Sequence, residues 1–185
     1  NGKPYLIVDI GGGSVEFIIA KKKQILWVES LPIGGLRLSK DFQQNAPMTR
    51  VEINELQSFL NFQLENLKQA IDEFKPKVLV GAAGSFETLS KIEYINFKNK
   101  SFPEFEKANR IDMDTFYQMA EIISKSDKIE LFEIPGMDDF RAELMPVSVV
   151  LIEKVLSLGH FKEIWYSDYA MKEGIFFEYL ETRKL

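Results

Sequence analysis

The chain has 185 residues, of which 45% are apolar and 28% are charged, an ordinary globular composition that suits a single domain of residues 1–185 or one lobe of a larger enzyme. Its net charge of −5 argues against nonspecific binding to DNA or a membrane surface, and the absence of cysteine excludes disulfides, thiolate metal sites and a thiol nucleophile. No stretch approaches the length of a membrane span and no signal peptide opens the chain, so we expect a cytoplasmic protein.

The first third of the chain predicts three strands and a long helix. Apolar segments at residues 4–10, 15–20 and 24–31 have such short connections that we expect an antiparallel meander. A short helix is expected at residues 36–42. Thr49 and Glu52 form a predicted capping box, and apolar residues at helical spacing then predict one long amphipathic helix that ends before Pro76.

The rest of the chain alternates strands and helices. Strands are expected at residues 77–81 and 163–167, and helices at 86–92, 112–123, 141–158 and 170–180. The polar segment 96–110 receives no assignment. A three-stranded meander extended by two strands, with helices on both faces, is the ribonuclease-H-like arrangement. We therefore predict one α/β domain.

A glycine loop joins the first two strands. Gly11, Gly12 and Gly13 permit positive φ and leave no Cβ between a ligand and the backbone. Successive N–H groups in such a turn converge on an anion, and the Ser14 hydroxyl adds a donor. We predict that this loop binds phosphate. A tight hairpin with solvated carboxylates is the alternative.

An acidic residue lies at each end of this loop. Asp9 would repel a phosphate unless it held a divalent cation, and Mg²⁺ prefers few carboxylates together with substrate oxygens. Glu16 could orient, or accept a proton from, a water molecule aimed at phosphorus. We therefore predict Asp9 as a metal ligand and Glu16 as a catalytic residue.

A second glycine loop lies between a strand and a helix. Gly81, Gly84 and Ser85 are candidate phosphate-binding residues there, because a helix N-terminus offers unpaired N–H groups and a favourable dipole. The alternative is a plain turn with Ser85 as the N-cap. Arg37, after the third strand, either reaches a phosphate or is a surface arginine. For Arg141 we expect a structural salt bridge.

These segments together resemble the exopolyphosphatase/guanosine pentaphosphate phosphohydrolase (Ppx/GppA) family over essentially the whole chain. Residues 9–16 (DIGGGSVE) resemble its DIGGGSTE signature, and residues 30–38 (SLPIGGLRL) its S-x-x-x-G-x-x-R-L segment. Residues 81–85 (GAAGS), 141–146 (RAELMP) and 167–174 (SDYAMKEG) resemble three further elements. The resemblance implies the second lobe of a two-lobed enzyme of the actin, Hsp70 and sugar-kinase superfamily.

The resemblance also implies an activity. The family releases orthophosphate from the end of polyphosphate, or from guanosine pentaphosphate, using Mg²⁺. Its usual catalytic base is a glutamate of the first lobe, which this chain lacks, so the isolated chain is expected to be nearly inactive. Family members often form homodimers.

This sequence departs from the family pattern at four positions. Val15 replaces threonine, Ser148 and Ala170 stand where glycine is common, and Lys172 replaces arginine without its bidentate fork. These departures leave the loop chemistry intact and put substrate preference in doubt. Two alternatives stay open: an ATP-binding lobe of a kinase or Hsp70-like ATPase, which would use the same loop for ATP phosphates, and a non-catalytic binder of polyphosphate or alarmone, which only these departures support.

Overall fold

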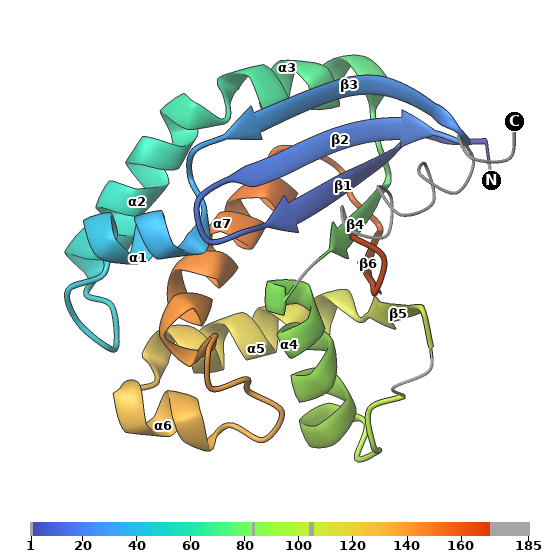
Figure 1. The fold of residues 1–185 in the computed structure, drawn as a ribbon. Helices are drawn as coiled ribbons and strands as arrows, with labels where there is room; N and C mark the ends of the chain where they lie inside the picture. The colour runs from blue at the N-terminus through green and yellow to red at the C-terminus, as the bar shows by residue number, and fades with distance from the viewer. Residues whose placement is uncertain (1, 83, 104–105, 171–185) are drawn as a thin grey trace, which may run out of the picture.

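The computed structural model describes residues 2–82, 84–103 and 106–170. These residues form a six-stranded sheet in the order β3-β2-β1-β4-β6-β5 (Figure 1). The strands are Tyr5–Ile10 (β1), Val15–Lys21 (β2), Gln24–Leu31 (β3), Val78–Ala82 (β4), Ala108–Ile111 (β5) and Glu163–Ser167 (β6). The α-helices are Gly35–Phe42 (α1), Arg50–Gln63 (α2), Glu65–Phe74 (α3), Gly84–Ile92 (α4), Met113–Lys125 (α5), Lys128–Glu133 (α6) and Met145–Ser157 (α7). A π-helix, Glu93–Phe97 (η1), follows α4, and a 3₁₀-helix, Ala142–Leu144 (η2), precedes α7.

The strand directions bring the two glycine loops to the same edge of the sheet. β1 is antiparallel to β2 and parallel to β4, and β4 is parallel to β6. In this register Asp9 of β1 lies beside both Glu16 of β2 and Ala82 of β4. The loops that follow β1 and β4 therefore leave the sheet side by side.

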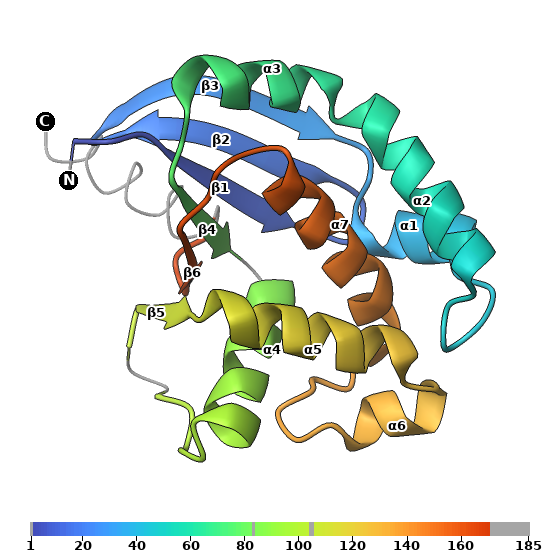
Figure 2. The same cartoon turned by 180° about the vertical axis from the view of Figure 1, so that it is seen from behind.

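The core lies between one face of the sheet and the helices α2, α3 and α7, which Figure 2 shows in front of that face. Alternate residues of β1, including Leu6 and Val8, are buried there, as period-2 packing requires. Most of α7 is buried, as its nearly continuous apolar sequence predicted. The capping box of Thr49 and Glu52 is confirmed at the start of α2.

The structure differs from the predicted elements in several places. No helix was expected at Lys128–Glu133, where α6 lies, and the helix expected from residue 141 begins as the 3₁₀-helix η2 before α7. A sixth strand, β5, lies in the unassigned segment; it has only four residues with little apolar pattern, and it forms by pairing with β6. The predicted long helix is divided at Leu64, whose φ of −96° and ψ of 15° leave helical geometry. The halves have different partners, since α2 packs on α1 and α7 while α3 packs on β2 and β3.

The prediction of helices on both faces depends partly on a helix at residues 170–180. Except for Ala170, that segment, with Lys172, lies outside the described residues. Within the described part of the chain, every helix is too short or too polar to cross a membrane.

Candidate functional site

The first glycine loop is held in place by its own backbone and by the start of α1. The Gly11 N–H donates to the Ser14 carbonyl (3.0 Å). The first two amides of α1 then bind the loop, since the Gly35 N–H donates to the Gly11 carbonyl (2.9 Å) and the Leu36 N–H to the Gly12 carbonyl (3.0 Å). The carbonyls of the turn are therefore directed at the helix.

This arrangement leaves a row of free donors. The N–H groups of Gly12, Gly13 and Ser14 donate to no described residue. A Cβ on Gly13 would meet no atom within 4 Å, so this side of the loop is open. Adjacent N–H groups that face open space are an anion-binding arrangement.

The glycines of the first loop do not use the positive φ that glycine permits. Among the described glycines only Gly136 has a positive φ. The backbone of the first loop leaves no room for a Cβ on Gly34, which would lie 2.5 Å from the Gly12 carbonyl carbon and from the Ser14 nitrogen. Sequence analysis did not select Gly34, although it lies in the S-x-x-x-G-x-x-R-L segment.

Two serines fix the carboxylate of Glu16. The Ser14 hydroxyl donates to Glu16 Oε1 (2.6 Å), and so does the hydroxyl of Ser30, its cross-strand neighbour on β3 (2.8 Å). The Ser14 hydroxyl is thus engaged by Glu16, while the Ser14 N–H remains free. The other carboxylate oxygen, Oε2, is left for a further partner. Ser30 is a positioning residue that sequence analysis missed.

Asp9 lies half-buried beside Glu16. Burial raises the pKa of Asp9, the neighbouring Glu16 carboxylate raises it further, and the Arg141 guanidinium acts in the opposite direction. No group of three or more acidic or histidine side chains among the described residues is arranged to hold a metal. Two adjacent carboxylates still fit Mg²⁺, which takes its remaining ligands from water and phosphate oxygens.

Arg141 approaches the second loop. A Cβ on Gly84 would lie 2.4 Å from the Arg141 guanidinium carbon, so this cation packs directly on the first residue of α4. None of the ion pairs among the described residues includes Arg141, contrary to the expected structural salt bridge. A cation at the positive end of a helix is electrostatically unfavourable unless an anion lies with it. Arg141 is therefore a site candidate.

The other two residues predicted in the second loop have structural surroundings. Gly81 lies inside β4, paired with β1 and β6, and the Phe86 ring occupies the space of its missing Cβ. The Ser85 side chain is 1% exposed and its hydroxyl donates to Ser148 Oγ (3.3 Å). Ser85 can offer a ligand only its backbone N–H in the first turn of α4. Packing accounts for Gly81 without a ligand.

The remaining residues that the sequence singled out lie outside the two glycine loops. Arg37 is exposed in the first turn of α1 and forms no ion pair with a described residue. Ser148 lies between the starts of α4 and α1, because its hydroxyl accepts from Ser85 and is 3.7 Å from a Cβ built on Gly35. Val15 is fully buried and points away from the loop. Asp168 pairs with Lys107 (2.8 Å).

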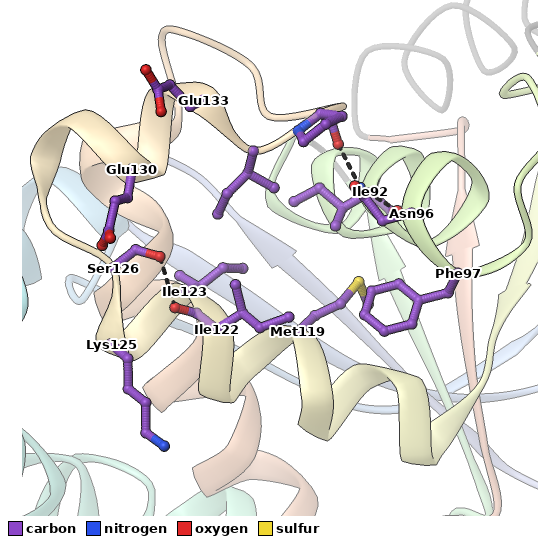
Figure 3. A pocket seen from close by; sticks show the side chains of 12 residues that line it. Ile92, Asn96, Phe97, Met119, Ile122, Ile123, Lys125, Ser126, Glu130 and Glu133 are labelled. Carbon is purple, nitrogen blue, oxygen red and sulfur yellow. Dashed lines mark hydrogen bonds between the residues drawn. The ribbon is translucent and has the colours of Figure 1, made fainter.

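A cavity of about 730 Å³ lies elsewhere, between α4–η1, α5 and α6 (Figure 3). Its lining includes Ile92, Met119, Ile122 and Ile134 and no residue of either glycine loop. Two polar side chains of its lining donate to backbone carbonyls, Ser126 to Ile122 (2.9 Å) and Asn96 to Ile92 (2.9 Å) and Pro135 (2.7 Å). The candidate site is therefore the open edge of the sheet and not this cavity.

Comparison with known proteins identifies the family. The sequence pattern of the Ppx/GppA phosphatase family matches residues 1–183. The chain belongs to this family. Exopolyphosphatase 1 of Mycobacterium leprae is 22% identical to this Ppx/GppA chain over 95% of it, but the match covers 51% of that relative. The chain thus spans about half the length of the curated relatives that it matches.

Solved structures agree with the Ppx/GppA assignment. An exopolyphosphatase from Cytophaga hutchinsonii is 33% identical and superposes with a TM-score of 0.92, covering 98% of this chain and 58% of that one. The Ppx/GppA member from Aquifex aeolicus, at 22% identity, has the same fold (TM-score 0.82, 100% of this chain and 58% of that one). The predicted fold class, a ribonuclease-H-like lobe of the actin type, is confirmed.

Proposed function

We propose that this chain is the phosphate-binding lobe of a phosphatase that releases orthophosphate from the end of polyphosphate, or from guanosine pentaphosphate, with Mg²⁺. The observation that carries the proposal is the convergence of donors at one edge of the sheet. Three N–H groups of the first loop have no described acceptor, the space beside Gly13 is open, and the Arg141 cation lies at the start of α4 with no ion pair among the described residues.

The binding step follows from these donors. The N–H groups of Gly12, Gly13 and Ser14 hold the oxygens of the terminal phosphate, and the Arg141 guanidinium and the first turn of α4 face the next one. Hydrogen bonds to a charged acceptor contribute about 1.5–3 kcal/mol each. Mg²⁺ bound at Asp9 would neutralise charge on the phosphate oxygens.

The chemical step is in-line attack of water on the terminal phosphorus. Glu16 Oε2 orients this water while Ser14 and Ser30 keep Oε1 fixed. Charge that develops on the transferring phosphoryl group is stabilised by donors already in place, the usual main source of catalysis in phosphoryl transfer. The rest of the cleft, including a glutamate base, belongs to a first lobe of the same polypeptide.

The test is a phosphate-release assay on the full-length protein with polyphosphate and with guanosine pentaphosphate, with and without Mg²⁺. Glu16→Gln is expected to lower kcat by about 100-fold or more, the usual cost of losing the orientation of a reactant. Arg141→Gln is expected to raise KM by about tenfold or more, the loss of a charge-assisted hydrogen bond. Exposed Glu55→Gln is the matched control and should leave both constants unchanged.

Near-wild-type turnover by Glu16→Gln would remove that residue from the mechanism. Phosphate transfer from ATP to a hydroxyl compound would favour the kinase-like alternative. Binding without turnover in the full-length protein would instead select the non-catalytic binder.

A further inference from the structure

Seven lysines gather at the edge of the sheet opposite the candidate site. We call this surface the lysine edge, and it consists of Lys3, Lys21, Lys22, Lys23, Lys75, Lys77 and Lys162. β1, β4 and β6 begin at this edge, and the first two of them run toward the glycine loops. In Figure 1 the N-terminus and the turn between β2 and β3 lie together here, and α1 lies at the far end.

Contacts connect the segments that carry these lysines. Lys3, Lys77 and Lys162 line a hollow of about 460 Å³, and Lys75 and Lys77 line a neighbouring one of about 400 Å³. The Lys162 N–H donates to the Lys77 carbonyl (2.8 Å). The lysine turn joins the first hollow through Tyr5, which lines it and donates its hydroxyl to the Lys22 carbonyl (3.0 Å).

The charge of this surface is not neutralised locally. Within the described part of the chain, no lysine of the lysine edge forms an ion pair. Two carboxylates line the hollows, those of Glu163 and Asp72, and Glu163 accepts a hydrogen bond from the Trp165 indole (2.8 Å). A strongly positive edge on a chain with a net charge of −5 requires a specific explanation.

We propose that the lysine edge is a second anion-binding site, which holds the distant part of a long polyphosphate chain whose end lies at the glycine loops. The proposal rests on the function proposed above. β1 has six residues, so the two edges are about 20 Å apart, a span that only a long polyphosphate crosses. Flexible lysines suit a polymer of repeated point charges, whereas a bidentate phosphate site favours arginine.

A second contact on one polymer raises affinity by making the second binding event intramolecular. The gain must therefore depend on chain length. A substrate of three phosphates reaches only the glycine loops, so its affinity does not depend on the lysine edge. A long chain occupies both surfaces and is held while its end is hydrolysed.

The experiment compares two triple variants of the full-length protein with the same change in charge. The first variant replaces three exposed lysines of the lysine edge with glutamine: Lys21, Lys23 and Lys162. It keeps Lys22 and Lys75, whose backbone is left-handed, and the half-buried Lys77. Lys68, Lys100 and Lys125→Gln changes exposed lysines elsewhere. The readouts are KM for long-chain polyphosphate and for tripolyphosphate, and fluorescence anisotropy with labelled long-chain polyphosphate at several salt concentrations.

The first variant is expected to weaken binding of long-chain polyphosphate about tenfold and to make this binding less dependent on salt. Its KM for tripolyphosphate and its kcat for both substrates should be unchanged. The second should match wild type. Equal loss for both chain lengths, or no loss for either, would overturn the proposal. So would a DNA or RNA oligonucleotide that binds the lysine edge as tightly as polyphosphate. If the protein hydrolyses neither substrate, the fluorescence anisotropy still measures binding of long-chain polyphosphate to the lysine edge.

Discussion

At the scale of single residues, Asp9 shows most clearly that the site is not arranged for stability. Its pKa is raised by burial and by the Glu16 carboxylate, although Arg141 offsets part of this. A carboxyl group whose pKa is higher in the folded than in the unfolded state reduces stability once both states have lost the proton. The ionised Asp9 therefore destabilises the fold at neutral pH.

We expect Asp9→Asn to raise the melting temperature of the full-length protein at pH 7. The gain should shrink as the pH falls toward and below the unfolded value of 3.8, because Asp9 is then protonated in both states. Mg²⁺ should stabilise wild type but not the variant, since only wild type keeps the proposed ligand. Differential scanning calorimetry at pH 7 and pH 4 measures both effects.

Glu55→Gln, which removes one exposed negative charge, controls for net charge in that experiment. If Asp9→Asn melts below wild type at pH 7, the carboxylate stabilises the fold and the electrostatic account is wrong. Equal stabilisation of both proteins by Mg²⁺ would remove Asp9 from the metal site.

At the scale of secondary-structure elements, the junction between the glycine loop and α1 shapes the site. Gly34 has a φ of −66° and a ψ of 160°, which alanine adopts freely, so only the lack of space requires glycine there. Any Cβ at this position meets three backbone atoms of the first loop within 2.6 Å. Backbone cannot rotate away as a long side chain can.

Gly34→Ala should therefore displace the loop and lower kcat/KM for phosphate release by at least tenfold. The circular dichroism spectrum should remain that of the folded protein, because the helices and strands do not depend on this contact. Gly2→Ala, where the nearest atom is a lysine side-chain carbon at 3.7 Å, is the matched control. Full activity in Gly34→Ala would show that the loop tolerates displacement.

Sequence patterns predicted elements well where local signals were strong. The β1–β2–β3 meander, the capping box at Thr49 and the buried helix α7 all follow from periodicity and capping chemistry. β5 could not be predicted, because its four residues are fixed by pairing with β6 rather than by their own preference. The bend at Leu64 likewise reflects different packing partners along one apolar stripe.

At the scale of the whole molecule, this chain covers 51% of Exopolyphosphatase 1 of Mycobacterium leprae and 58% of the Cytophaga hutchinsonii structure. The candidate site lies at an open edge, where a second lobe would complete it. Residues 1–185 expressed alone are therefore expected to release phosphate at less than about one hundredth of the full-length rate, since they would lack the proposed first lobe and the base proposed on it.

That prediction is checked by assaying the isolated chain and the full-length protein side by side, with circular dichroism to establish folding of the fragment. A partial return of activity when the missing half is added in trans would support a shared cleft. Full turnover by the fragment alone would contradict the two-lobe account.

The amino-acid sequence by itself determined the fold class and the position of the first glycine loop between β1 and β2, because apolar patterns and short connections are local signals. Only the tertiary structure decided which residues of the second loop are taken up by packing. Gly81 and Ser85 are taken up by packing against Phe86 and Ser148, whereas Arg141, about sixty residues later, meets Gly84. Sequence spacing carries no information on such contacts, since folding brings together side chains from separate elements.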